Sequence, residues 1–191
     1  MNITGKGMKF RWLNNAGFEM ELSSGKHLLV DPWLDEAQVY PISINEIERA
    51  DYVLLTHTHD DHSDSIGRIQ KRFPQAAIFV GDLSAEALCK EYDLNVERLF
   101  RIRGREEYEF DDVKIEVISA RHTESKGGNY WDRGYCIQKD GSRRETMWYG
   151  SLEMYNFRIT DVNGYRAVVW GGMTTEEQIH RMEKYRGNEI A

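Results

Sequence analysis

The most informative segment of the chain, residues 54 to 64, reads Leu54-Leu55-Thr56-His57-Thr58-His59-Asp60-Asp61-His62-Ser63-Asp64. It places three of the six histidines directly behind an apolar strand pattern. On an extended backbone His57 and His59 lie on the same side, and a following turn brings Asp61 and His62 toward the same place. Imidazoles and carboxylates suit Zn²⁺, iron or Mn²⁺, with one coordination position left for water. The segment therefore predicts a metal site.

The alternative is a solvated, histidine-rich turn whose side chains serve as caps and local hydrogen-bonding groups. For an isolated histidine that interpretation is the better one. Here the pattern His-x-His-x-Asp-His follows at once on the apolar residues 52–55, and this combination favours metal binding.

Length and charge limit the class of protein. A chain of 191 residues accommodates one domain with a substantial core, so we expect a single domain over residues 1–191. Its 25 basic and 32 acidic residues give a formal net charge of −7, which argues against a general nucleic-acid-binding surface. The basic exception, Arg101, Arg103 and Arg105, is interpreted as a solvated strand end, with steering of a phosphorylated substrate as the alternative.

Location and redox state follow from other parts of the chain. The first seven residues have no apolar core, and no stretch is long and apolar enough to cross a membrane. We therefore expect a cytoplasmic protein without a membrane span. Cys89 lies in a helical pattern and Cys136 in a strand pattern, which favours two buried thiols over a disulfide, and neither has metal-ligand spacing.

Apolar periodicity and turn residues predict alternating strands and helices. Strands are expected at residues 10–13, 18–22, 27–30, 52–55, 76–80, 100–102, 108–110, 113–118, 134–138, 146–148, 157–160 and 165–170. Helices are expected along Ile66, Ile69 and Phe73 before Pro74, and along Ala85, Leu88, Cys89 and Tyr92.

The end of the chain carries the clearest local signals. Asn163-Gly164 predicts a tight hairpin turn between the last two strands. Thr174 and Glu177 form a capping box for a final helix with Ile179 and Met182 on one face and Gly187 as its C-terminal cap. Strands at both ends with helices between them, in two similar halves, predict an α/β (α+β) protein built as a four-layered αβ/βα sandwich.

The segment Thr56 to Asp64 resembles the signature of the metallo-β-lactamase superfamily. Upstream, residues 12–18 and 28–33 resemble the opening hairpins of its lactonase-like branch, which includes ascorbate-6-phosphate lactonases and N-acyl-phosphatidylethanolamine phospholipase D. Downstream, residues 117–122 resemble the strand that delivers the third histidine of the family. The resemblance covers nearly the whole chain and implies the same sandwich, although only the histidine motif is highly specific.

The resemblance implies a ligand set and a mechanism. His57, His59 and His122 would form the first metal site, where Zn²⁺ lowers the pKa of bound water to about 7 and supplies a hydroxide nucleophile. Asp61 and His62, the expected catalytic residues, would also be ligands of the second site, with Asp61 orienting the nucleophilic water. Asp31 is either a support for an imidazole N–H or a simple turn carboxylate.

The sequence departs from the family pattern in the second site. The family bridges its metals with an aspartate, whereas the best-matching turn, residues 170–174, has Gly172 at that place, and an alternative register offers only Ser151. Asp161 lies at the opposite end of the strand and is not promoted to a ligand. The final strand, which leads to the last histidine of the family, is represented only by its beginning at residues 188–191. A single-metal site is favoured.

The other histidines, Asn15 and a group of aromatic residues are not assigned as metal ligands. His27 and His180 are expected on the surface. Asn15 is interpreted as a loop-forming residue, with substrate contact as the alternative. The aromatic residues Tyr130, Trp131 and Tyr135 either wall the site or serve ordinary packing.

The sequence is compatible with several functions. The first is a zinc hydrolase for a small ester, lactone or phosphodiester, with one or two ions and with Mn²⁺ or iron as substitutes. The second is a metal-binding relative with weak or no catalysis, because the second site is incomplete. The third is a di-iron redox protein, which His59 disfavours because related flavodiiron proteins carry glutamate there. A homo-oligomer is possible through an exposed sheet edge.

Overall fold

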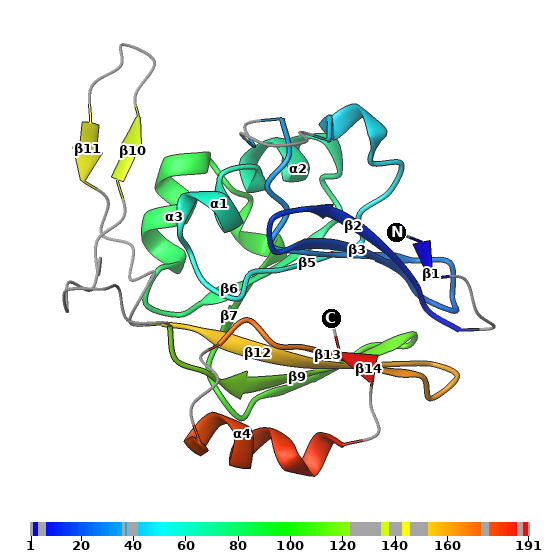
Figure 1. Cartoon of the computed structure of the whole chain (residues 1–191). Helices are drawn as coiled ribbons and strands as arrows, with labels where there is room; N and C mark the ends of the chain where they lie inside the picture. Colours follow the sequence, from blue (N-terminus) through cyan, green and yellow to red (C-terminus); the bar gives the residue numbers. More distant parts are fainter. Residues whose placement is uncertain are drawn as a thin grey trace.

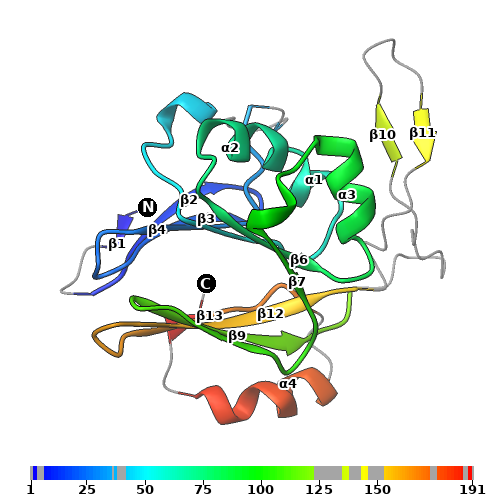
Figure 2. The ribbon, with the colours of Figure 1, turned by 180° about the vertical axis from the view of Figure 1, so that it is seen from behind.

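Two β-sheets lie face to face, with helices on their outer sides, in the computed structural model (Figure 1; Figure 2). The structure describes residues 2–3, 7–35, 37, 42–122, 135–137, 143–145, 153–172, 176–186 and 189–190. The layers follow the order helix, sheet, sheet, helix, so the α+β sandwich expected from the sequence is confirmed.

The first sheet has the strand order β1-β2-β3-β4-β5-β6-β7, which is also the order along the chain. Its strands are β1 (Asn2–Ile3), β2 (Lys9–Asn14), β3 (Gly17–Glu21), β4 (His27–Val30), β5 (Tyr52–Leu54), β6 (Ala77–Gly81) and β7 (Leu99–Ile102). The first four are antiparallel, and β4 to β7 are parallel. The parallel strands need crossovers. These contain η1 (Ile44–Glu46), α1 (Asp60–Ser63), α2 (Ile66–Arg72), α3 (Ala85–Tyr92) and η2 (Val96–Arg98).

The second sheet has the order β14-β13-β12-β9-β8. Its strands are β8 (Glu107–Glu109), β9 (Val113–Ser119), β12 (Tyr155–Asp161), β13 (Arg166–Val169) and β14 (Glu189–Ile190). Helix α4 (Glu176–Met182) and η3 (Glu183–Tyr185) lie on its outer face (Figure 1). Strands β10 (Tyr135–Ile137) and β11 (Arg143–Glu145) form a separate antiparallel pair.

The core has three parts: one between the two sheets, one between the first sheet and its helices, and a small one where Val168 of β13 packs against Met182 and Tyr185. Leu28 and Val30 of β4 face the second sheet and pack in the cluster between the sheets, whereas Leu29 faces the helices. Phe79 of β6 and Phe157 of β12 are fully buried between the sheets. Strands β5 and β6 are buried on both faces, so the centre of the sheet is a firm support for the loops at its ends.

Most sequence predictions for individual elements agree with the structure. The β12–β13 hairpin forms at the predicted turn, with Gly164 at a φ of 80°. The predicted strand at 146–148, the cap residue Thr174 and Gly187 lie outside the described residues. Ile179 and Met182 line the same surface hollow together with Val168, so the predicted shared face of α4 is confirmed, although Met182 is buried and Ile179 is 46% exposed. In the described part of the chain, no helix combines the length and apolar character that a membrane span needs.

Candidate metal centre

The loop after β5 carries the first two histidines of the motif. Strand β5 ends at Leu54, and His59 occupies the position immediately before helix α1. Asp31, at the end of β4, fixes the start of this loop: its Oδ1 accepts the Thr56 N–H at 2.7 Å, and its Oδ2 accepts the Thr56 hydroxyl at 2.6 Å. Asp31 has a φ of 42°, a left-handed conformation that aspartate tolerates better than most residues. The carboxylate thus acts as a turn residue and as an anchor of the histidine loop.

Three histidines from two sheets meet at this end of the sandwich. His57 Nε2 lies 3.0 Å from His59 Nδ1, and the ring of His122, just beyond β9, lies 4.9 Å from that of His57 and 4.7 Å from that of His59. One ligand nitrogen from each histidine lies within 4.8 Å of the others. Zn–N bonds of about 2.0–2.1 Å place tetrahedral ligand atoms about 3.3 Å apart. The donor set therefore fits a metal ion after small side-chain adjustments.

His62 and Asp61 lie beside this cluster. The His62 ring is centred 3.9 Å from that of His57. Its Nδ1 lies 2.9 Å from Asp31 Oδ2. The two side chains form an ion pair, but the contact does not have the geometry of a hydrogen bond. His62 Nε2 lies 3.7 Å from Asp61 Oδ1. Among the described residues, His57, His59 and His122 are the one group with metal-ligand geometry. His62 is instead held between two carboxylates.

The histidines differ in protonation because their neighbours differ. Burial lowers the pKa of His57 well below its ordinary value, and the positive charges of His62, His59 and His122 lower it further. Burial also lowers the pKa of His62, but the charge and close contact of Asp31, with Asp61, outweigh burial and raise it. His57 is therefore neutral and available as a ligand, whereas His62 is biased toward the cation.

Two carboxylates at the start of α1 have different surroundings. Asp61 is partly exposed, and its Oδ2 accepts a hydrogen bond from the side-chain amide of Asn15 at 2.7 Å. Asn15 has a φ of 42°, so it is both the loop-forming residue that the sequence indicated and a contact of the site. Burial, followed by the charges of Asp64 and Asp61, raises the pKa of Asp60 to about 6.

The turn after β13 approaches the site without offering a carboxylate. The buried Asn156 side chain accepts the N–H groups of Gly171 and Gly172 at 3.0 and 3.1 Å. A Cβ at Gly172 would lie 3.0 Å from the Cβ of Ala120. Position 172 therefore adjoins the segment that carries His122, as the resemblance implied. Ser151, the other candidate at this place, lies outside the described residues, as do Tyr130 and Trp131.

The other singled-out residues lie elsewhere. Asp161 binds Ser23 and the N–H groups of its own hairpin turn, far from the histidines. His180 is exposed and pairs with Glu183 at 3.3 Å. His27 is partly exposed, with 20% of its side-chain surface accessible, and its Nδ1 lies 2.8 Å from the buried Glu19 carboxylate.

The structure also shows the surroundings of the arginine cluster and of Cys89. Arg101 and Arg103 both bind Asp82, which favours the solvated strand end over an anion site. The thiol of Cys89 is free and partly buried, and burial raises its pKa.

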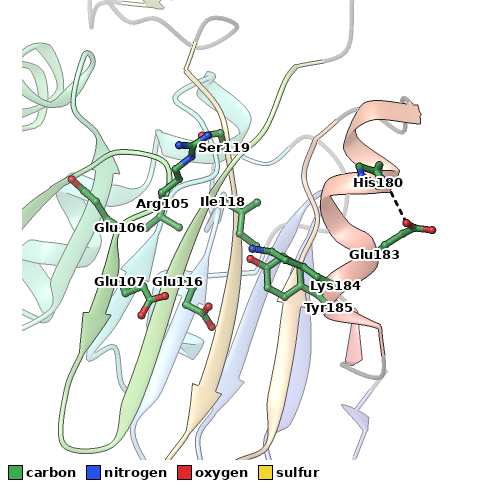
Figure 3. Close-up of a pocket in the computed structure, with 11 residues that line it drawn as sticks. Arg105, Glu106, Glu107, Glu116, Ile118, Ser119, His180, Glu183, Lys184 and Tyr185 are labelled. Carbon is green, nitrogen blue, oxygen red and sulfur yellow. Dashed lines mark ion pairs between the residues drawn. The ribbon is translucent and has the colours of Figure 1, made fainter.

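A groove of about 700 Å³ lies on the outer face of the second sheet, between β8, β9 and α4 (Figure 3). Several of its charged side chains are paired within the chain, as Glu107 is with Lys114 and Glu116 with Arg158. Glu116 and Ile118 point to this groove, while Ile115 and Val117 of the same strand pack between the sheets. The groove is therefore separated from the histidines by the sheet.

One polar residue near the site has no signal in the sequence. Glu153, directly before β12, is buried, and its carboxylate accepts hydrogen bonds from the N–H groups of Leu83 and Ser84. Its partners lie about 70 positions away in the chain. No local pattern marks such a residue.

Comparison with known proteins identifies the class. The sequence model of the beta-lactamase superfamily domain matches residues 9–152, and the chain belongs to this superfamily. A UPF0173 metal-dependent hydrolase of Aeropyrum pernix is 34% identical over 96 residues, which cover 48% of this chain and 39% of that protein. This chain thus spans about two fifths of the length of that relative. The lactonase-like branch stays a prediction.

Solved structures agree on the fold. A possible metal-dependent hydrolase from Veillonella parvula has a TM-score of 0.67 at 14% identity, over 96% of this chain and 70% of that one. The diiron beta-hydroxylase CmlA from Streptomyces venezuelae has a TM-score of 0.61 at 13% identity, over 98% of this chain and 34% of that one. At these identities the likeness shows the fold alone, and the fold hosts more than one chemistry.

Proposed function

We propose that the chain carries the metal centre of a hydrolase that acts on a small molecule with an ester, lactone or phosphodiester bond. The observation that carries the proposal is the convergence of His57, His59 and His122 from two sheets. Membership of the superfamily and the printed name of the Aeropyrum pernix relative support it. A cytoplasmic location, a single domain and a homo-oligomer stay predictions from the sequence.

The residues present suit one metal ion, and zinc is the first choice from the ligand type, ahead of Mn²⁺ and iron. Zn²⁺ held by three neutral imidazoles lowers the pKa of bound water to about 7. Burial keeps His57 neutral and so keeps it a ligand. Asp61, positioned by Asn15 on the exposed side of the cluster, would orient water and accept its proton.

The second candidate function is metal binding with weak or no turnover. It is favoured by the ion pair between His62 and Asp31, which occupies one nitrogen of an expected second-site ligand. Gly172 adds no side chain to that site. A mononuclear site stabilises an oxyanion less than a two-metal site does, yet still supports hydrolysis.

The test is the metal content per chain by elemental mass spectrometry, before and after incubation with Zn²⁺. We expect a ratio of about one in the native protein, and none in the double variant His57→Ala/His59→Ala. His180→Ala, an exposed histidine outside the cluster, is the matched control and should bind as the native chain does. A native chain without metal in excess Zn²⁺ would contradict both candidates.

Turnover separates the two candidates. Hydrolysis of a simple lactone or of an aryl phosphodiester that is abolished in the double variant supports the hydrolase. Hydrolysis that persists unchanged in the double variant rejects it, and metal binding without hydrolysis of either probe supports the second candidate.

A further inference from the structure

Glu153 is a buried carboxylate at the point where the second sheet meets the loops of the first. It is 7% exposed. Its Oε1 accepts the Leu83 N–H at 3.0 Å and the Tyr155 hydroxyl at 3.0 Å, and its Oε2 accepts the Ser84 N–H at 3.2 Å. Three donors offset much of the cost of burying this charge. Glu153 therefore fixes the β6–α3 loop to the start of β12.

The β6–α3 loop in turn contacts the residue between the first two histidines. The Thr58 hydroxyl donates to Ser84 Oγ at 3.2 Å, and both side chains are buried. On its other side, the Thr58 carbonyl accepts the Ser63 hydroxyl at 3.3 Å. Since Thr58 lies between His57 and His59, its hydrogen bond to Ser84 joins the segment that carries both histidines to the β6–α3 loop.

The residues after Glu153 contact both histidine-bearing segments. The Tyr155 N–H donates to the Thr56 carbonyl at 2.8 Å, one residue before His57. The Met154 carbonyl accepts the Ala120 N–H at 2.9 Å, two residues before His122. The segment 153–155 is thus a junction between the two sources of the three histidines.

The space for this carboxylate is provided by a glycine. A Cβ at Gly81, the last residue of β6, would overlap the Glu153 carboxyl group. A side chain larger than hydrogen at position 81 therefore excludes the glutamate from its present position.

We propose that Glu153 is a positioning residue of the metal centre: through Ser84 and Thr58 it holds the His57–His59 loop in the geometry that binds metal. The inference rests on the proposed metal-binding function. It assigns Glu153 no contact with metal or substrate.

The test compares Glu153→Gln with Asp112→Asn. Asp112 is a matched control because it is equally buried, at 7% exposure, and its carboxylate also accepts three hydrogen bonds between the two sheets, at the opposite end of the sandwich. Each amide variant keeps the shape and opposes one hydrogen-bond donor with its NH₂ group. Both should lose stability.

The readouts are the Zn²⁺ dissociation constant by chelator competition and the visible spectrum of the Co²⁺ form. Replacing groups that orient metal ligands weakens binding about 10- to 100-fold, and we expect this for Glu153→Gln, with an altered Co²⁺ spectrum. Asp112→Asn should match the native chain in both. Ser84→Ala, which removes only the hydroxyl link, should weaken binding less, in the same direction, and replaces Glu153→Gln if that variant does not fold.

The outcomes separate the two proposals. Native binding with equal affinities for Glu153→Gln, Ser84→Ala and Asp112→Asn overturns the positioning role alone. No binding by the native chain overturns the metal centre, and the positioning role with it. A weakened Glu153→Gln beside an unaffected Asp112→Asn supports both.

Discussion

At the end of the sandwich away from the histidines, Asp112 accepts hydrogen bonds from Lys26 at 2.9 Å, from Tyr52 at 2.8 Å and from Ser24 at 3.1 Å. Asp161 accepts the Ser23 hydroxyl beside it. Asp112 and Asp161 thus both accept hydrogen bonds from side chains of the first sheet or its β3–β4 turn. These hydrogen bonds connect the two sheets at this end of the sandwich.

At the histidine end, three imidazoles lie close together beside buried carboxylates and hydroxyl groups. The rings of His57, His59 and His122 pack in T-shaped contacts, and burial, followed by the charges of the neighbouring histidines, lowers the pKa of His57. Asp31 accepts the Thr56 N–H of the histidine loop, and Glu153 accepts the Ser84 N–H of the neighbouring β6–α3 loop. The difference teaches that the carboxylates at one end join the two sheets, whereas those at the other end hold the loops beside the three histidines.

The largest effect on this comparison is expected from Asp31→Asn. Asparagine tolerates the positive φ, but its NH₂ group replaces one of the two oxygens that accept from Thr56. We expect Zn²⁺ affinity to fall about 10- to 100-fold, measured by chelator competition. If the Zn²⁺ affinity stays within about twofold of the native value, a difference of at most about 0.4 kcal/mol in binding free energy, the loop keeps its geometry without this anchor.

Asp112→Asn addresses the opposite end. The substitution removes a buried, charge-assisted set of hydrogen bonds, and the free energy of unfolding should fall by about 1–3 kcal/mol. Urea denaturation measures this loss, and metal titration of the same variant should show no change. A weakened metal site in this variant would mean that the two ends are coupled through the sheets.

The difference in free energy of unfolding between the native chain and Asp112→Asn should also depend on pH. Burial raises the pKa of Asp112, but hydrogen bonds from Lys26, Tyr52 and Ser24 outweigh it and hold the pKa below its ordinary value of 3.8. Since the folded pKa is the lower one, the contribution is complete above the unfolded value and is lost as the pH falls through the folded value.

The stability difference between the native chain and Asp112→Asn should therefore be constant near neutral pH and shrink below about pH 4. Denaturation series across this range measure it. On the alkaline side, the hydrogen bond to Asp112 raises the pKa of Lys26, so its contribution is lost only as the pH rises through that raised value. A difference that stays constant through the acid range would contradict the role of the charged carboxylate.

The smallest effect is expected from Asn15→Gly, which keeps a residue suited to positive φ and removes the amide that binds Asp61. The contact is exposed, so stability should change by about 0.5 kcal/mol or less. Metal content should stay as in the native chain, while kcat on a lactone probe should fall a few-fold because Asp61 is less fixed. Loss of metal in this variant would place Asn15 among the supports of the metal centre instead.

Local patterns in the sequence were sufficient for most of the fold. Period-two alternation predicted β4 and β12, and the Asn163-Gly164 pair predicted the turn that the structure has. Helical spacing also predicted the shared face of Ile179 and Met182, but spacing alone does not give the depth of burial: Met182 is buried and Ile179 is 46% exposed.

In the site, too, contacts between residues close in the sequence were predictable, whereas contacts between distant residues were not predictable from local patterns. His57 and His59 are two residues apart, so backbone geometry alone brings them together. His122 was assigned through the family resemblance, and the structure brings it to the same cluster. Glu153 was missed because its role comes from backbone N–H groups of Leu83 and Ser84, which no side-chain pattern reveals.

The order of strands in the first sheet bears on when the metal centre is completed during synthesis. Strands β1 to β7 each pair with their neighbour in the chain, so this sheet can form progressively as it is made. His122 follows β9, whose principal partner β12 is separated from it by a long connection and is synthesised later. A newly made chain should therefore hold two of the three histidines in place well before the third. Tight metal capture would then mark the docking of the second sheet, and pulse-labelled folding intermediates would bind zinc only after that step.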